Sequence, residues 1–352
     1  MEGAVYQSNG VRVAFGSGAM ATLAAEAARL DIARSVVLCS PGRTVVAESL
    51  VRILGREAAV ICDAARPNFP ESAFDEAMAV IRDAGANGFV VVGGGTPVGL
   101  AKSVAAASRL PFIAVPTTYS GSELASNWYV GRAENKRHGN DAHALPATII
   151  YDPELTLGLS PSTTAASGMN AMAHAVESLY GADLNPVVAV MAAEAVRLLG
   201  DSLPRCVDRP DDLAARGEAL KGAWFAAGFR SGRGLSHAMA QRIRDAFDLD
   251  HARTHAVSLP YAVAFNAPAA REAMVAIGKV LGVKDAARGL YDLNRRLGLA
   301  TGYCDLGMPR DGIERAVELV AAAKITHPRP AGADQVRRVV EAAWAGDPPP
   351  DF

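Results

Sequence analysis

The first third of the chain constrains its fold most strongly, because short apolar segments alternate there with helical ones. Ser35–Cys39 (SVVLC), Ala58–Cys62 and Gly88–Val92 (GFVVV) have the continuous apolar character of strands that are buried on both faces. The segments between them, Thr44–Leu54 and Glu71–Ala84, have the pattern of helices. Strands that alternate with helices of this length predict a doubly wound parallel sheet in a Rossmann-like α/β domain.

A helical region follows this α/β region. Residues 117–145 are polar and irregular, Ala147–Tyr151 is one further strand, and the rest of the chain is helical and rich in alanine. A chain of 352 residues is too long for one ordinary hydrophobic core. We therefore predict an α/β domain at residues 1–155 and an all-α domain at residues 156–352. Apart from the histidine-rich stretch described below, the helices predicted in the second domain are Ala165–Tyr180, Pro186–Leu199, Leu213–Phe229, Pro268–Leu281, Asp285–Leu297, Asp311–Ala323 and Asp334–Ala345.

Charge and cysteine content argue against several classes of protein. The net charge is −2 without any block of like charges, which argues against nucleic acid or an anionic membrane as a partner. The four cysteines form no CxxC pair, so the sequence indicates neither a thiolate zinc site nor a disulfide framework. No apolar run reaches the roughly 20 residues of a membrane span, and the first residues lack the features of a signal peptide. We expect a cytoplasmic protein.

The sequence Val90–Leu100 (VVVGGGTPVGL) predicts a phosphate-binding loop. A strand, a glycine turn and a helix follow one another here, so a diphosphate could approach the backbone and the N–H groups at the helix N-terminus. The spacing differs from both GxGxxG and the Walker A motif, and a tight turn without a ligand is the alternative. The predicted dinucleotide-binding residues of this loop are Gly93, Gly94, Gly95, Thr96 and Pro97.

Two other positions are expected beside this loop, where ligands bind at the carboxyl ends of parallel strands. The segment PTTYSGSE contributes the hydroxyls of Thr117, Thr118, Ser120 and Ser122. An ordinary capping loop with Ser122 as a helix N-cap is the alternative. Ser40 follows the second strand, where an acidic residue would bind the ribose 2′-hydroxyl and repel a 2′-phosphate.

Histidines gather in one stretch of the helical domain, Gly234–Pro260. It contains His237, His251 and His255, and His174 lies upstream in GMNAMAHAVE. Residues four apart share one face of a helix, so Asn170 lies beside His174 and Gln241 beside His237. Facing polar residues of this kind form cofactor, metal and substrate sites in helical bundles. For any one histidine taken alone, an ordinary core or surface residue is the alternative that its sequence context favours.

Six stretches together resemble the iron-containing alcohol dehydrogenase superfamily, and within it most closely the maleylacetate reductases. The stretches are GGGTPVGLAK, PTTYSGSE, LPATIIYDPELT, GMNAMAHAVE, HARTHAVSLPYAVAFNAP and HPRPAG. The resemblance implies a dehydroquinate synthase-like architecture: a dinucleotide-binding N-terminal domain, an all-α C-terminal domain, a cleft between them and a homodimer. It also implies NADH or NADPH as the cofactor and a small dicarboxylate as the substrate.

The same resemblance bears on metal binding. Metal-dependent members hold Fe²⁺ or Zn²⁺ with one Asp and three His, whose positions here are Asn170, His174, His237 and His251. Asparagine removes the anionic ligand, and the maleylacetate reductases, which also have Asn here, resemble enzymes that work without metal. We therefore expect no bound metal; if one were bound, its ligands would be His174, His237 and His251. Gln241 departs from both branches, which usually have His at this position.

The leading interpretation is an NAD(P)H-dependent oxidoreductase that reduces maleylacetate to 3-oxoadipate in the degradation of aromatic compounds. The predicted catalytic residues are His174, His237, His251 and His255. The predicted substrate-binding residues are Asn170, Arg230, Arg233, Gln241 and Arg242. Three alternatives stay open: a metal-dependent alcohol or aldehyde dehydrogenase, a lyase like dehydroquinate synthase, and a diverged non-catalytic dinucleotide-binding protein. The lyase requires a lysine-rich phosphate pocket, whereas the second half of this chain is poor in lysine.

Overall fold

The computed structural model describes residues 10–131, 136–182, 184–228, 234–323, 325 and 328–352. The described chain divides into two compact units between Gly158 and Leu159. Each unit has its own hydrophobic core. None of the helices in the described part is long and apolar enough to cross a membrane.

The N-terminal unit is built on a six-stranded parallel sheet, which confirms the predicted α/β fold. The strand order is β1-β8-β5-β4-β2-β3. The strands are β1 (Arg12–Phe15), β2 (Ser35–Leu38), β3 (Ala59–Cys62), β4 (Gly88–Gly93), β5 (Phe112–Pro116) and β8 (Thr148–Tyr151). The three neighbouring strands β2, β4 and β5 are buried throughout, as their uninterrupted apolar sequences predict.

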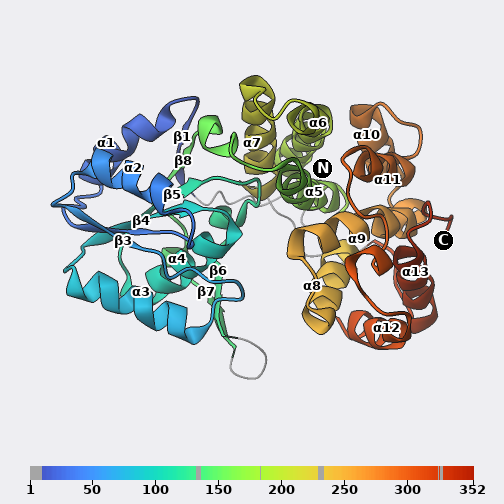
Figure 1. The fold of residues 1–352 in the computed structure, drawn as a ribbon. Helices are drawn as coiled ribbons and strands as arrows, with labels where there is room; N and C mark the ends of the chain where they lie inside the picture. The colour runs from blue at the N-terminus through green and yellow to red at the C-terminus, as the bar shows by residue number, and fades with distance from the viewer. Residues whose placement is uncertain (1–9, 132–135, 183, 229–233, 324, 326–327) are drawn as a thin grey trace. The chain divides into compact units, whose positions relative to one another are not determined.

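Helices cover both faces of this sheet. They are α1 (Leu23–Arg29), α2 (Thr44–Leu54), α3 (Glu71–Asp83) and α4 (Gly95–Ser108). Figure 1 shows α1 and α2 on one face and α3 and α4 on the other. The chain leaves β2 toward β3 but leaves β4 toward β5, so its direction reverses between β2 and β4. In open α/β sheets, ligands bind outside the carboxyl ends of the strands at such a reversal.

An antiparallel pair of strands lies in the segment that the sequence pattern presents as irregular. β6 (Asn127–Val130) pairs with β7 (Arg137–Asn140). β7 has the sequence RHGN, which lacks any alternation of apolar and polar residues. The ring of Trp128 lies over Gly139, where an added Cβ would be 3.1 Å from the indole nitrogen. This pair is therefore stabilised by packing that the sequence pattern does not reveal.

The C-terminal unit is helical, as predicted. Its helices are α5 (Pro161–Ser178), α6 (Pro186–Asp208), α7 (Leu213–Gly228), α8 (Leu235–Phe247), α9 (His251–Asn266), α10 (Arg271–Leu281), α11 (Ala286–Arg296), α12 (Ile313–Ala321) and α13 (Ala333–Ala345). α5 and α9 are buried on nearly all sides and pack against each other. A helix that is buried all round belongs to the core, so side chains on α5 and α9 are well placed to form an enclosed site.

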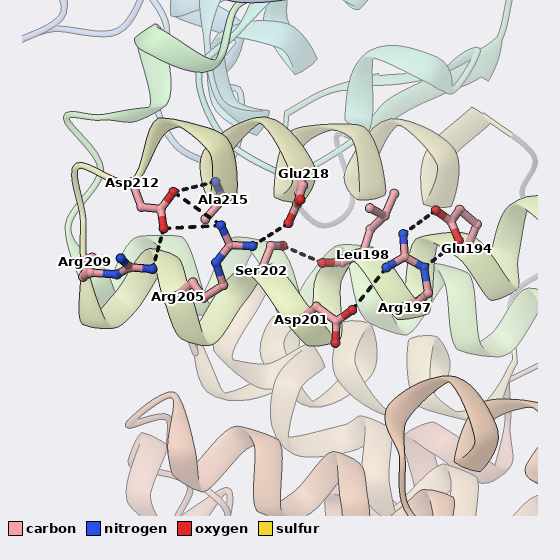
Figure 2. A network of polar contacts seen from close by, with 10 residues as sticks. All are labelled: Glu194, Arg197, Leu198, Asp201, Ser202, Arg205, Arg209, Asp212, Ala215 and Glu218. Atoms are coloured by element: carbon pink, nitrogen blue, oxygen red, sulfur yellow. Dashed lines mark hydrogen bonds and ion pairs between the residues drawn. The ribbon is translucent and has the colours of Figure 1, made fainter.

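Charged side chains connect α6 with the start of α7 (Figure 2). Arg205 Nη1 donates to Glu218 at 2.8 Å, and Arg209 Nη2 donates to Asp212 at 2.8 Å. Asp212 also accepts a hydrogen bond from the backbone N–H of Ala215 at 2.9 Å, which places it at the start of α7. The other residues of the network are Glu194, Arg197, Leu198, Asp201 and Ser202. Exposed ion pairs contribute little individually, so their main effect is to fix the turn between two helices.

Candidate functional site

The glycine loop lies at the carboxyl end of β4 and leads into α4. Gly93 has a φ of 137°, which favours glycine, and a Cβ there would be 2.5 Å from Pro97 Cγ. Gly94 is the N-cap of α4, and a Cβ there would be 2.8 Å from Thr118 Cγ2. A Cβ at Gly95 would meet nothing closer than 3.8 Å. No side chain caps α4, so the N–H groups of its first turn suit an anion such as a diphosphate.

The predicted hydroxyl loop, residues 116–123 (PTTYSGSE), lies directly beside the glycine loop, Gly93–Pro97. The N–H of Thr117 donates to the carbonyl of Gly93 at 3.0 Å, and Thr118 packs against Gly94. Lys102, buried in α4, donates to the carbonyl of Ser122 at 3.1 Å and so connects α4 to the hydroxyl loop. The oxygens of the Ser120 and Ser122 hydroxyls are 3.4 Å apart.

The alternative role considered for Ser122 is wrong in its detail. The N-cap of this short helical turn is Gly121, and no side chain caps it. Ser40 is half-buried just after β2, the strand next to β4. Residues of three neighbouring strand ends therefore lie along one edge of the sheet.

The histidines lie together in the C-terminal unit, on α5, α8 and α9. His174 and His237 have ring centroids 4.2 Å apart, and their Nε2 atoms are separated by 3.4 Å. The ring of His255 is 4.7 Å from that of His237 and 4.7 Å from that of His251. The four rings thus form a continuous row in the order His174, His237, His255, His251. His237 and His255 are buried, whereas His251 is exposed at the start of α9.

The electrostatic environment of His251 differs from that of an isolated histidine. Part of His251 reaches solvent, but neighbouring protein groups remove much of the hydration of its ring. This loss of hydration is the largest cause that lowers the pKa of His251 from 6.5 to about 4, and the nearby Arg244 and His237 lower it further. Arg244, in the last turn of α8, was not among the residues predicted from the sequence. An imidazole with a lowered pKa is uncharged at neutral pH, so His251 offers hydrogen bonds rather than positive charge.

The remaining predicted residues fall into three groups. Asn170 is buried on α5, one turn before His174. Gln241 is half-buried on α8, one turn after His237, whereas Arg242 is exposed. Arg230 and Arg233 lie outside the residues that the structure describes.

Glu177 belongs to the histidine cluster, and the sequence reasoning missed it. Its carboxylate is buried and accepts hydrogen bonds from the N–H groups of Gly234 (3.2 Å) and Ser236 (2.7 Å). It is also in close contact with His237 Nδ1. Glu177 follows His174 by three residues, so helical spacing placed it on the same face of α5. That spacing was the only signal available, because its partners are nearly sixty residues away along the chain.

Comparisons with known proteins cover both units. Residues 10–153 match the family model described as iron-containing alcohol dehydrogenase. Residues 164–344 match the model described as Fe-containing alcohol dehydrogenase family, C-terminal. The chain belongs to the iron-containing alcohol dehydrogenase family. It is therefore an oxidoreductase.

Relatives within this family share the whole length of the chain. The maleylacetate reductase of Burkholderia cepacia is 40% identical over 98% of this chain and 99% of its own. Two crystal structures of maleylacetate reductases are each 35% identical and cover 99% of this chain and all of their own. They come from Agrobacterium tumefaciens, with a TM-score of 0.95, and from Rhizobium sp. strain MTP-10005, with a TM-score of 0.94.

The name of the iron-containing alcohol dehydrogenase family implies a metal ion, but the residues present do not fit one well. The Nε2 atoms of His174 and His237 converge, yet Asn170 contributes a neutral amide at the position where the resemblance to metal-dependent members implies an Asp ligand. Among the residues that the structure describes, no group of three or more His, Cys, Asp or Glu side chains could hold a metal ion. A dication with neutral donors alone would lose hydration without gaining an opposite charge.

Proposed function

We propose that the protein is an NAD(P)H-dependent maleylacetate reductase, which converts maleylacetate to 3-oxoadipate. The observation that carries this proposal is that relatives named maleylacetate reductase share 35% to 40% identity along nearly the whole chain. Family membership and the phosphate-binding geometry of the glycine loop support NAD(P)H as the hydride donor. The neutral Asn170 supports this reading over that of a metal-dependent alcohol dehydrogenase.

The reaction requires charge stabilisation and one proton. Bound NAD(P)H supplies a hydride. The alkene carbon β to the ketone accepts it, the π electrons move toward the ketone, and the ketone oxygen becomes an enolate. The enolate then collapses and the carbon α to the ketone takes a proton, which leaves 3-oxoadipate and NAD(P)⁺. The protein must therefore neutralise two carboxylates, stabilise the enolate and deliver one proton.

Each of these tasks can be assigned to predicted residues. We assign Gly93–Pro97, Thr117, Thr118, Ser120 and Ser122 to the cofactor diphosphate, and Ser40 to its ribose. We assign the histidine row to enolate stabilisation and proton delivery, because imidazole both donates and accepts protons near neutral pH. Asn170 and Gln241 offer amide donors to the substrate, and Arg230, Arg233 and Arg242 are cations for its carboxylates.

We further propose that the enzyme works without metal, in the cytoplasm and as a homodimer. The donor set around His174 and His237 supports the first point. The other two rest on resemblance to the family, and light scattering on the purified protein tests the dimer.

An activity assay on chelator-treated protein tests the function. We expect maleylacetate to be reduced with oxidation of NADH or NADPH, and we expect His237→Ala to lower kcat strongly. A saturated 4-oxo dicarboxylate, which has no alkene to accept the hydride, is the matched control. Reduction of aldehydes alone, lost on chelation and restored by Fe²⁺ or Zn²⁺, would instead identify a metal-dependent alcohol dehydrogenase.

A further inference from the structure

We propose that Glu177 is a positioning residue of the histidine cluster, which holds His237 in the tautomer protonated on Nδ1 and fixes the direction of its Nε2. The effect on turnover rests on the proposed function, whereas the tautomer itself does not. Glu177 does not touch the substrate in this proposal; it acts only through His237.

The first step of the argument is the hydrogen bonding of the Glu177 carboxylate. Its Oε1 accepts from the N–H of Ser236 at 2.7 Å, and its Oε2 accepts from the N–H of Gly234 at 3.2 Å. Both oxygens therefore face backbone donors that cannot change their role. An ionised carboxylate is an acceptor only, so the third partner, His237 Nδ1, has to donate.

The second step is the place of this carboxylate in the fold. It lies at the N-terminus of α8, a helix of 13 residues, where the helix dipole and unpaired N–H groups stabilise a negative charge. Gly234 permits this approach, because a Cβ there would be 2.5 Å from Glu177 Oε1 and 2.8 Å from its Cδ. The start of α8 therefore has room for the carboxylate because residue 234 is glycine.

The third step concerns the other ring nitrogen. With its proton on Nδ1, neutral His237 directs a lone pair from Nε2 toward His174 Nε2, 3.4 Å away. A hydrogen bond between two nitrogens requires one proton between them, so His174 donates it. In the opposite tautomer, His237 would carry its proton on Nε2, where it could face the N–H of His174. The hydrogen bond between these two rings would then be lost. A carboxylate that orients a histidine in this way is a recurrent device behind reacting imidazoles.

A purely structural role for Glu177, as a cap for α8, makes a different prediction. A cap stabilises the helix but leaves the reaction and the tautomer of His237 unchanged once the protein is folded. The tautomer is read directly from the ¹⁵N shifts of the imidazole nitrogens in histidine-labelled, substrate-free protein. The spectrum of His237→Gln identifies the signals of His237.

The decisive variant is Glu177→Gln. A carboxamide presents one oxygen and one NH₂ group, so its NH₂ has to face at least one of the three donors. His237 relieves this conflict by moving its proton to Nε2, because Nδ1 then accepts from the amide. We expect the signals of His237 to shift toward the Nε2–H tautomer and kcat for maleylacetate to fall by about 10- to 100-fold. KM should stay within about threefold, because Glu177 does not contact the substrate.

Two further variants test the same contact without removing the carboxylate. Gly234→Ala should push the intact carboxylate away and reproduce the change of tautomer. Glu177→Asp keeps an acceptor-only group, so it should retain the Nδ1–H tautomer and recover part of the lost turnover. Glu26→Gln removes a buried carboxylate in the other unit and should alter neither the tautomer nor kcat.

The results separate the two levels of the proposal. If folded Glu177→Gln and Gly234→Ala both keep the Nδ1–H tautomer and the kcat of the wild type, the positioning role is wrong, while the proposed function stands. If Glu177→Gln does not fold, Gly234→Ala and Glu177→Asp decide by the same two readouts. If the wild type reduces no maleylacetate, the tautomer measurement on substrate-free protein still tests the role of Glu177.

Discussion

The three glycines at the end of β4 have three different surroundings. Gly93 has a backbone conformation that disfavours other residues, and Gly94 is pressed against Thr118. Neither reason applies to Gly95, where an added Cβ would meet only Ser120, at 3.8 Å, which is an ordinary contact. A glycine with room for a side chain at a bare helix N-terminus is the position where a ligand would need the space.

Gly95→Val therefore tests the cofactor site without disturbing the fold. We expect the Kd for NADH to rise at least about tenfold, or 1.4 kcal/mol, while the Tm changes little. Fluorescence titration and thermal melting measure the two effects. Gly94→Val is the contrasting variant and should lower the Tm, because its Cβ meets Thr118. Unchanged NADH affinity in a folded Gly95→Val protein would contradict the phosphate-loop assignment.

Ser40 allows a prediction about cofactor choice. A serine does not repel a 2′-phosphate as a carboxylate would, so we expect the wild type to use both NADH and NADPH. Ser40→Asp should lower kcat/KM with NADPH by at least about tenfold, because like charges in contact are costly. Ser40→Asn, which adds similar volume without charge, is the control. Equal use of NADPH by the wild type and Ser40→Asp would place Ser40 away from the ribose.

At the scale of elements, α9 contains a proline whose cost is offset by another helix. Pro260 has no N–H, so the carbonyl of Ala256, four residues earlier, lacks its helical partner. The side chain of Asn294, fully buried on α11, donates to that carbonyl at 2.6 Å. Asn294 of α11 thus replaces the hydrogen bond that Pro260 removes from α9.

This hydrogen bond predicts that the effects of Asn294→Ala and Pro260→Ala on stability are coupled. Asn294→Ala should cost about 1–3 kcal/mol of unfolding free energy, because it leaves a buried carbonyl unsatisfied. Pro260→Ala restores the N–H within α9, so Asn294→Ala should cost about 1 kcal/mol less in that background. A double-mutant cycle by urea denaturation measures the difference. Additive effects would show that Asn294 stabilises the protein by another route.

A second link connects α1 to the sheet through Glu26. Burial raises the pKa of Glu26, but hydrogen bonds from Arg29, Arg12 and Thr148 outweigh it and leave the pKa below its usual value. A lowered pKa in the folded state stabilises the protein above the unfolded pKa, and that contribution is lost as pH falls through the folded value. We expect Glu26→Gln to cost about 1 kcal/mol at pH 7, a modest figure because both arginines are partly exposed.

Urea denaturation of both proteins at several pH values tests this expectation. The difference between wild type and Glu26→Gln should shrink as pH falls below about 4.3, the usual pKa of glutamate. Asp83→Asn, which removes a fully solvated ion pair with Arg82, should show little difference at any pH. A difference that does not depend on pH would mean that shape, and not charge, determines the role of Glu26.

Local patterns predicted the elements well and their ends less well. β4 and the glycine loop were predictable because their signals lie within a dozen consecutive residues. α6 continues past the predicted end at Leu199 to Asp208, through Gly200 and Pro204. A Cβ at Gly200 would be 2.7 Å from Leu281 Cδ2, so this glycine reflects the approach of α10 and not the end of a helix. The contacts of Glu177 were hidden for the same reason: they depend on tertiary packing.

At the scale of the whole molecule, the net charge is so small that any attraction for anionic ligands has to come from individual groups near their sites. A net charge of −2 offers no long-range attraction for a dicarboxylate or a dinucleotide. We therefore expect binding to depend on local groups, such as the N–H groups at the N-terminus of α4 for the dinucleotide. The neutral Asn170 fits this distribution, because a carboxylate there would repel an anionic substrate unless a metal compensated it.

This balance leads to a prediction about metal. We expect the purified protein to hold well under one equivalent of Fe or Zn and to keep its activity and Tm after chelation. Asn170→Asp adds an anionic donor one turn from His174, whose Nε2 converges with that of His237. We expect this variant to bind Zn²⁺ more tightly and to gain Tm with added Zn²⁺, while its kcat for maleylacetate falls because a negative charge is added near a dianionic substrate.

Asn170→Leu, which removes the amide without adding a donor, should gain no affinity for Zn²⁺. Calorimetric titration with Zn²⁺, metal analysis and kinetics on the same samples measure all three effects. Stoichiometric metal in the wild type, lost together with activity on chelation, would reverse this account of Asn170.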